Sequence, residues 1–518
     1  MTRHHGPLLA ATLAVLVAAP GGHAQEVRPL SSIDWLSNSL DTTAPPRPER
    51  RPVRGQAGGA GIVAVTVTPL GAPAPDGVGL TAPEEVGLAP GLWGASTTDD
   101  LARRISDLPE QPLPAARDAL KRILLARLDP PMGGGTPGAL LTARVDALLR
   151  MGALNDAQIL LERAGPLRPE LFRRAFDIAL LLGEEDAGCA TLDASPGIAP
   201  SISTRIFCLA RRGDWPAAAL TLDTAEALGQ LTAVEDTLLA RFLDAEIAED
   251  ALLPIPRMPA PTPLQWRMLE AIGERQPTAP LPLAFGHADL RSASGWRARL
   301  EATERLVRAG ALPPQHLADV YAERAPAASG GLWDRVAAVQ SLDRALETGA
   351  PRPIGRALSD AWAEMTSAGL GPAFAEVIAP RLADTDLPRS SADLALRIAL
   401  LSSDYEAAAL SNFDSVDPQA RAFAMGLPPD AADVPEAPLS RALAAAFSGT
   451  AAPSPRLARL QAEGKLGEAL IVALTTVAAG ASADPADLTG ALVFLRTIGM
   501  EDTARRAALQ LYLLESGA

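Results

Sequence analysis

Lysine is almost missing from this chain of 518 residues. Lys121 and Lys465 are the only lysines among 46 basic residues, and neither follows a serine at Ser-x-x-Lys spacing. That spacing is needed by penicillin-binding enzymes, whose chemistry is therefore excluded. The other basic residues are arginine, and we interpret this bias, together with the abundance of alanine and proline, as a product of GC-rich coding.

Histidine and cysteine are scarce as well. Beyond residue 24 the chain has two histidines, His287 and His316, and two cysteines, Cys189 and Cys208. Each histidine follows a loop or begins a helical pattern, so we expect surface or capping roles. Four such scattered residues do not supply a common zinc site, and we predict no metal site.

Several catalytic motifs are also missing. The sequence has no Gly-x-Ser-x-Gly, no P-loop, no dinucleotide-binding glycine fingerprint and no calcium loop. Acid pairs occur at Glu84–Glu85, Asp99–Asp100 and Glu184–Asp186, where we expect them to favour the starts of helices. We predict no catalytic residue and no cofactor. Because glycosidase carboxylates come from separate elements, an enzyme or accessory factor acting on cell-wall glycan remains the alternative.

Acidic residues outnumber basic ones, 61 against 46, which gives a net charge of −15. Nucleic acids and anionic membranes attract positive surfaces. The sequence therefore predicts no nucleic-acid partner.

Residues 1–24 are typical of a secretory signal peptide. Arg3 precedes the apolar run Leu8–Ala19, and small residues at Gly22 and Ala24 predict cleavage before Gln25. The alternative is an uncleaved anchor. No later uncharged apolar run approaches the length of a membrane span, about 20 residues. We therefore expect a periplasmic protein without an integral membrane segment after cleavage.

The cysteine count is even, which favours a disulfide in an oxidising compartment. Cys189 and Cys208 flank a turn at 193–197 between two helical patterns, and their midpoint falls just inside that turn. In an antiparallel helix pair they would face each other. A bridge closing about 20 residues would stabilise the fold by roughly 3 kcal/mol. Two buried free thiols are the alternative.

The chain divides by composition into an arm and a helical body. The arm contains a Pro/Arg-rich and Gly-rich linker, a short helix at 31–40 and one strand at 62–68. In the short helix, the apolar residues Ile33, Trp35, Leu36 and Leu40 are candidates for partner binding. The predicted segments are the signal peptide 1–24, the arm 25–95 and helical repeats at 96–252, 264–425 and 438–518.

From Thr98, the expected N-cap of the first helix, the pattern is helical nearly to the end. Apolar residues recur at helical spacing in segments of 10–18 residues separated by Gly, Pro or Asp. Clear examples are Pro169–Leu182, Ser201–Arg212, Trp333–Glu347 and Ser391–Leu401. The fold class predicted is all-α.

One turn recurs at the spacing Leu, three residues, Gly, four residues, Ala. Glycine ends a helix where positive φ is needed, and alanine lets the next helix approach closely. The four copies place glycine at Gly152, Gly213, Gly464 and Gly499, with alanine at Ala157, Ala218, Ala469 and Ala504.

This turn resembles the one between the two helices of a tetratricopeptide repeat. Pro169, twelve residues after Ala157, falls where that family often places a proline, and Gly464 and Gly499 are 35 residues apart, close to the family's period of 34. The resemblance implies an α-solenoid of antiparallel helical hairpins. Any antiparallel helix pair with a glycine stop could produce the same spacing.

At the level of the whole chain, the sequence is similar to exported bacterial proteins labelled "antifreeze glycopeptide polyprotein". The similar stretches are Arg205–Pro216 and Pro326–Arg335. The label implies ice or ligand binding, although the sequence has no tandem Ala-Ala-Thr array. Ala327–Arg335 is also the sharpest local anion-site candidate, with a flexible helix entry as the alternative.

Five tryptophans lie in the helical part, where packing between helices is expected and a ligand-binding face is the alternative. They are Trp215, Trp266, Trp296, Trp333 and Trp362.

Taken together, these features of the sequence favour a non-catalytic periplasmic interaction scaffold that binds a protein or peptide of the cell envelope.

Overall fold

The computed structural model describes residues 74–165, 168–244, 255, 258–291, 293–411 and 417–515. Within them the chain is all-helical and has no strand, only an isolated bridge between Thr81 and Ala126. The predicted signal peptide, the four partner-binding residues between Ile33 and Leu40, and the strand at 62–68 lie outside the described residues.

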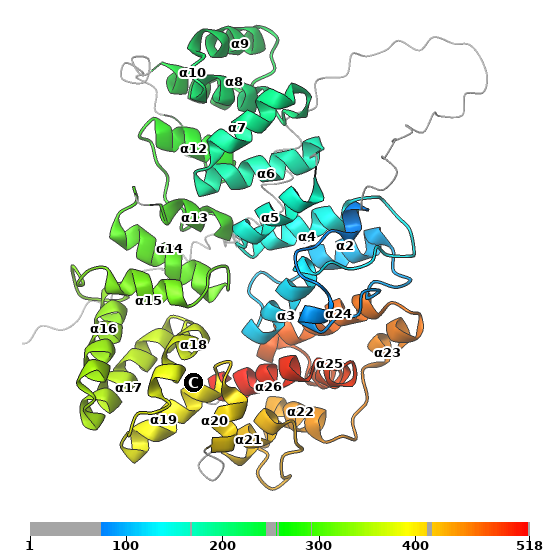
Figure 1. The fold of residues 1–518 in the computed structure, drawn as a ribbon, viewed down its shortest axis with the longest axis vertical. Helices are drawn as coiled ribbons and strands as arrows, with labels where there is room; N and C mark the ends of the chain where they lie inside the picture. The colour runs from blue at the N-terminus through cyan, green and yellow to red at the C-terminus, as the bar shows by residue number, and fades with distance from the viewer. Residues whose placement is uncertain are drawn as a thin grey trace, which may run out of the picture.

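The helices follow one another along the chain, most of them joined by short turns and a few by longer loops such as 126–138 and 426–437 (Figure 1). The first group is η1 (Pro75–Gly77), η2 (Glu84–Val86), α2 (Thr98–Ser106), α3 (Pro114–Leu125), α4 (Ala139–Arg150) and α5 (Leu154–Ala164). The second group is α6 (Pro169–Leu182), α7 (Glu185–Ala194), η3 (Pro196–Ile198), α8 (Ile202–Arg211), α9 (Trp215–Ala227), α10 (Ala233–Leu243) and α12 (Pro263–Ala271).

The remaining helices lead back to the beginning of the chain. The third group is η4 (Leu283–Phe285), α13 (Gly286–Asp289), α14 (Trp296–Arg308), α15 (Gln315–Ala322), α16 (Leu332–Thr348), α17 (Pro351–Ser367), α18 (Gly371–Leu382), α19 (Arg389–Leu400), α20 (Tyr405–Ser411) and α21 (Pro418–Met425). The last group is α22 (Pro438–Phe447), α23 (Pro455–Ala462), α24 (Leu466–Ala478), η5 (Gly480–Ser482), α25 (Pro485–Thr497) and α26 (Glu501–Glu515).

A chain with 47 prolines can be this helical because many prolines lie in the first turn of a helix, where no backbone N–H bond is lost. Helices α3, α6, α12, α17 and α25 all begin in this way. At α12, Thr262 and Gln265 also form a capping box, with reciprocal bonds of 3.2 and 2.9 Å. The N-cap of α2 is Thr97 rather than the predicted Thr98, because the Thr97 hydroxyl accepts the bond from the Asp100 amide.

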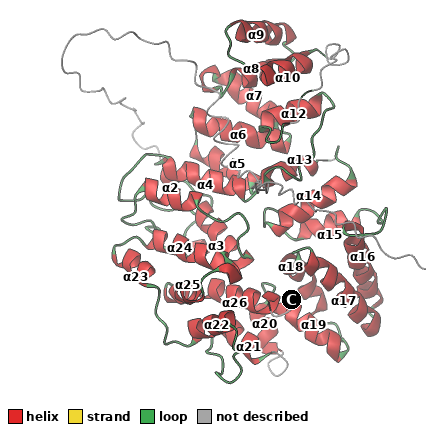
Figure 2. Ribbon diagram, turned by 180° about the vertical axis from the view of Figure 1, so that it is seen from behind, coloured by secondary structure: helices red, strands yellow, loops and turns green. Residues whose placement is uncertain are grey.

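The last helices pack against the first, so part of the chain closes into a ring. Helices α24 and α26 contact α3, α24 also contacts α2, and α4 contacts η4 across the ring. Figures 1 and 2 show the C-terminal hairpins beside α2 and α3 from both sides. The Leu113 amide donates to the Ala478 carbonyl at 3.1 Å, and the Ala115 amide donates to Gln510 Oε1 at 2.9 Å.

Helices α6 to α12 project from this ring (Figure 2). They are called the arm below and are distinct from the N-terminal segment 25–95. The arm has its own hydrophobic core, which includes Phe172, Phe176, Phe207 and Leu269, while a larger core continues through the rest of the helical body. Leu269 of α12 belongs to the arm core, so this core includes residues on both sides of the proline-rich stretch before Pro263. The predicted break before Pro438 falls in the loop between α21 and α22.

Residues 74–95, assigned to the arm segment from the sequence, pack onto the helical body instead. The Trp93 side chain is fully buried, and a Cβ on Gly467 would lie 2.5 Å from its ring. The Gly467 amide donates to the Leu92 carbonyl at 2.8 Å. The apolar residues of this segment therefore belong to the core.

Candidate functional site: an arginine-lined cavity

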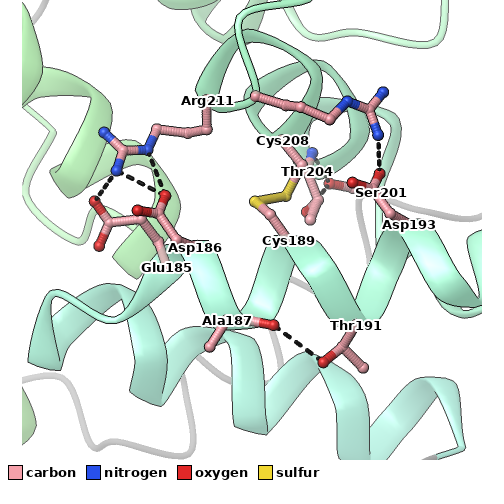
Figure 3. The surroundings of a disulfide bond; sticks show 11 residues. Glu185, Asp186, Ala187, Cys189, Thr191, Asp193, Ser201, Thr204, Cys208 and Arg211 are labelled. Carbon is pink, nitrogen blue, oxygen red and sulfur yellow. Dashed lines mark hydrogen bonds and ion pairs between the residues drawn. A yellow bond between two sulfur atoms is a disulfide. The ribbon is translucent and has the colours of Figure 1, made fainter.

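The two cysteines are joined in a disulfide between α7 and α8 (Figure 3). The Cα atoms of Cys189 and Cys208 are 5.2 Å apart, and both residues are buried in the arm core. Beside them, Arg211 of α8 pairs with Asp186 of α7 at 2.7 Å. No histidine contacts the pair among the described residues. The disulfide therefore holds two helices of the arm together and has the surroundings of a structural bridge.

The four recurring turns share one backbone geometry. Their glycines have positive φ, from +71° at Gly152 to +88° at Gly499. In each turn the residue after glycine donates to the carbonyl of the motif's leucine, for example Ala153 to Leu148 at 2.8 Å. This is the Schellman motif. The alanines of the motif are fully buried at positions Ala157, Ala218, Ala469 and Ala504.

His287 is buried rather than exposed or capping a helix. Its Nε2 lies 2.7 Å from the carbonyl oxygen of Gly152, which links α13 to the first recurring turn. Burial lowers the pKa of His287, only partly offset by this bond. The sequence did not reveal this because the partner carbonyl lies 135 residues away. His316 is exposed on α15.

The sequence offered two kinds of candidate for ligand contact, the stretch Ala327–Arg335 and the tryptophans of the helical part, and the structure places them differently. At Ala327–Arg335, Asp334 accepts a bond from the Gly330 amide at 3.0 Å, so a carboxylate already lies at the entry of α16. Trp266 is fully buried, as packing between helices predicts, whereas Trp215 is 48% exposed on α9, contrary to that expectation. Trp362 is half-buried and lines a cavity.

This cavity, of about 990 Å³, lies inside the ring. It is bounded by the start of α3, the end of α4, the loop before η4, helices α14, α17, α18 and α19, the turn after α24, and α26. Apolar side chains line much of it, including Leu113, Leu281, Leu283, Trp362, Leu511 and Leu514. The cavity thus depends on the return of the C-terminal helices to the beginning of the chain.

The charged lining of the cavity is almost entirely cationic. Five arginines contribute to it, and the only carboxylate among the lining residues is that of Glu110, which is exposed. The arginines are Arg117 of α3, Arg150 of α4, Arg305 and Arg308 of α14, and Arg397 of α19. The protein as a whole has a net charge of −15, yet the lining of this cavity is positive, so the cavity would attract an anion.

A smaller cavity of about 450 Å³ adjoins the first and shares Arg117 and Arg308 with it. Its lining also contains Asp118 and Glu376, and both carboxylates lie within 3.6 Å of the Arg506 guanidinium. The smaller cavity is thus lined by four basic residues, Arg117, Lys121, Arg308 and Arg506, and by two carboxylates. Basic residues outnumber acids in both cavities, and the excess is larger in the first, with five arginines against one carboxylate.

The sequence contained no local signal for these five arginines. They come from four helices between residues 114 and 400. Arginine is also frequent throughout the chain, so these five do not differ from the others in the sequence. Only the closure of the ring brings them together. A search for motifs within one helix or turn could not have found such a set.

The described residues contain no group of three or more His, Cys, Asp or Glu side chains arranged to hold a metal ion. In the same part of the chain, no helix is both long enough and apolar enough to cross a membrane. Comparison of the chain with protein-family models, with curated proteins and with solved structures finds no match.

Proposed function

We propose that this protein is a non-catalytic binding protein of the periplasm, in which a ring of helical hairpins receives part of a protein or peptide partner of the cell envelope. The observation that carries the proposal is the 990 Å³ cavity lined by residues of both the early helices α3 and α4 and the last helix α26. Ligand pockets commonly occupy about 300–1,000 Å³. A cavity of this size accommodates a few side chains or one end of a peptide.

The hairpins are proposed to be degenerate tetratricopeptide-like repeats. Four turns with the same Leu–Gly–Ala spacing and the same Schellman hydrogen bonds support this. Repeats of this kind form solenoids, which present concave surfaces to their partners. In this chain the concave side of such a solenoid would be the wall of the cavity, since α24 and α26 return to α3.

Export is proposed from the signal-like residues 1–24 and is supported by the Cys189–Cys208 disulfide. Disulfides persist mainly in oxidising compartments. N-terminal sequencing of the protein from a periplasmic fraction tests this placement, with Gln25 expected as the first residue. Recovery of the intact N-terminus in a membrane fraction would contradict it.

The lining favours binding over glycan hydrolysis. Glycosidases generally use two carboxyl groups flanking the bond that is broken. The cavity contributes one, Glu110, against five arginines. Release of soluble fragments from purified peptidoglycan by the protein would favour the enzymatic alternative.

The test of partner binding uses a matched pair of blocking variants. Ser482 lines the cavity, whereas Ser448 follows α22 away from it, and both are exposed and donate to a carbonyl three residues earlier. We expect full-length protein isolated from its native cells to retain a specific partner, Ser482→Trp to lose it and Ser448→Trp to keep it. Retention by both variants, or no partner with wild type, would contradict the proposal.

A further inference from the structure

We infer that the large cavity is a site for an oxyanion, a carboxylate or a phosphate, carried on an apolar body. This deepens the proposed function and rests on it, because it names the chemistry that the cavity would recognise in its ligand. The inference follows from how the five arginines are paired, from the helix ends at the cavity and from its apolar wall.

Three of the five arginines have no carboxylate partner within ion-pair distance among the described residues. Arg150 donates to the carbonyls of Ile105, Ser106 and Leu108 at 2.6 to 3.2 Å. These carbonyls lie at the end of α2, so Arg150 caps that helix. These carbonyl oxygens accept from Nη1 and Nη2 of Arg150, while its buried Nε has no hydrogen-bond partner among the described residues. The carbonyls carry no net charge that could neutralise the guanidinium.

Arg305 and Arg397 are held in the same way. Arg305 donates to the carbonyl of Thr278 at 3.0 Å and to that of Leu281, while Arg397 donates to the carbonyl of Leu513 in α26. Burial lowers the pKa of Arg150 and of Arg305, which shows that desolvation of these cations exceeds the compensation by nearby acids. A bound anion would supply the missing compensation.

The other two arginines are only partly neutralised. Arg117 bonds to Asp118 at 2.9 Å, and a further bond joins its guanidinium to the carbonyl of Arg308. Arg308 lies 4.0 Å from Glu304. That carboxylate already accepts two bonds from Arg335 and one from the Tyr321 hydroxyl. The charge of Glu304 is therefore shared among several donors.

Backbone dipoles and apolar residues complete the site. Helix α18 begins at Gly371, which lines the cavity. Helix α3 also begins at the cavity, but Pro114 has no N–H and the Ala115 amide already donates to Gln510, so α18 provides the freer helix end. Helix N-termini favour anions. The arginines alone would suit inorganic phosphate. The leucines of the wall and Trp362, however, would leave such a small, hydrated ion in contact with apolar surface. An anion with an apolar body matches both parts of the lining.

Two fluorescent probes test the anion requirement directly. 1-Anilinonaphthalene-8-sulfonate and N-phenyl-1-naphthylamine share the same apolar rings, and only the first carries an oxyanion. With the purified mature chain at low salt, we expect one sulfonate probe per chain, bound at least tenfold more tightly than the neutral probe. Raising the salt should weaken the sulfonate probe selectively. Equal affinity for both probes would overturn the inference.

A matched pair of double variants locates the site. Arg305→Gln with Arg397→Gln removes two cavity charges, whereas Arg297→Gln with Arg441→Gln removes two exposed ones outside the lining, one of them also on α14. We expect the first pair to weaken the sulfonate probe at least tenfold and the second to change it less than twofold. Equal effects of the two pairs would overturn the inference.

Competition identifies the natural group and separates this inference from the proposed function. Decanoate and decyl phosphate should displace the sulfonate probe and decanol should not; the tighter of the two anions marks the preferred head group. Displacement by decanol alone would overturn the inference. Because these measurements use purified protein and small probes, a failure to isolate a macromolecular partner leaves the oxyanion result intact, and the reverse also holds.

Discussion

The imidazole of His287 donates from Nε2 to the carbonyl oxygen of Gly152 at 2.7 Å, and this bond ties α13 to the turn between α4 and α5. Both residues lie beside the cavity wall, because a Cβ on Gly152 would come within 2.9 Å of Leu283. The packing of a glycine turn and the protonation of a buried histidine are therefore coupled at one edge of the ring.

Acidification is expected to destabilise this edge. Burial lowers the pKa of His287 below its ordinary 6.5, so the unfolded chain takes up a proton that the folded chain resists. The stability contributed by neutral His287 is complete above about pH 6.5 and is lost as the pH falls toward its folded-state pKa. His287→Gln should flatten the fall of the melting temperature between pH 7 and 5, as followed by calorimetry. His316→Gln, an exposed control, should not; a parallel profile for both variants would contradict the assignment.

The arm should respond to pH in the opposite direction. Burial raises the pKa of Asp177 in α6 to about 7, against the lowering effect of Arg173 and Arg174. The folded chain therefore holds a proton that the unfolded chain releases near pH 3.8. Its stabilising effect is complete below that pH and is lost as the pH rises through 7.

Asp177→Asn removes this titration, so the difference in melting temperature between variant and wild type should change steadily from pH 5.5 to 8.5. Asp223→Asn, on the exposed side of α9, is the matched control and should give a constant difference. A constant difference for Asp177→Asn as well would show that this carboxyl is ionised throughout.

Two of the recurring glycines should differ in their tolerance of alanine. Gly152 and Gly213 both have positive φ, at +71° and +85°, so alanine costs about 1–2 kcal/mol at either position. At Gly213 the added Cβ meets nothing within 4 Å, whereas at Gly152 it meets Leu283 and Ala311. Gly152→Ala should therefore cost at least about 1 kcal/mol more. Urea unfolding measures the difference, and equal costs would show that Leu283 moves away freely.

Loss of the disulfide should loosen the arm selectively. Replacing Cys189 and Cys208 by serine frees a loop with a sequence separation of 19 and is expected to cost roughly 3 kcal/mol. Hydrogen exchange should accelerate in α7 and α8 and stay unchanged in α24 and α26, since the arm has its own core. Equal acceleration in both regions would show that the two cores unfold as one unit.

Closure of the ring can be tested at a glycine contact. A Cβ on Gly94 would lie 2.0 Å from the carbonyl oxygen of Gly464, while one on Gly87 would meet nothing within 4 Å; both residues have positive φ. Gly94→Ala should increase hydrogen exchange in α2 and α24 and raise the radius of gyration in solution scattering. Gly87→Ala should leave both unchanged. Indistinguishable variants would mean that this contact does not hold the ring closed.

Local signals in the sequence located helices well, because caps and stops act within a few residues. The bounds of α6, Pro169–Leu182, agree with the prediction, since proline at its first turn and Gly183 after its end are both local. Further turns of the same kind, for example those at Gly310 and Gly369, do not show the full sequence motif. Four residues before Gly369 stands Met365 instead of leucine, and five residues after it the second helix buries Phe374 instead of alanine, so the sequence signature is missing.

The cavity could not be predicted in the same way. Arg150 and Arg305 approach the same hollow only because α4 contacts η4, and Arg397 reaches α26 only because the chain returns to its beginning. Both contacts depend on packing between segments far apart in sequence. The burial of Trp93 depends equally on α24, a contact that no local pattern in the segment 25–95 could indicate.

The return of α24 and α26 to α3 also sets when the molecule can finish folding. Helix α3 is made early, yet the amide of Ala115 finds its acceptor 395 residues later, at Gln510. In a chain that lacks α24 and α26, the side of α3 that contacts them would be uncovered, and exposed apolar surface of this kind favours aggregation. This surface of α3 is therefore covered only once the later helices have been made.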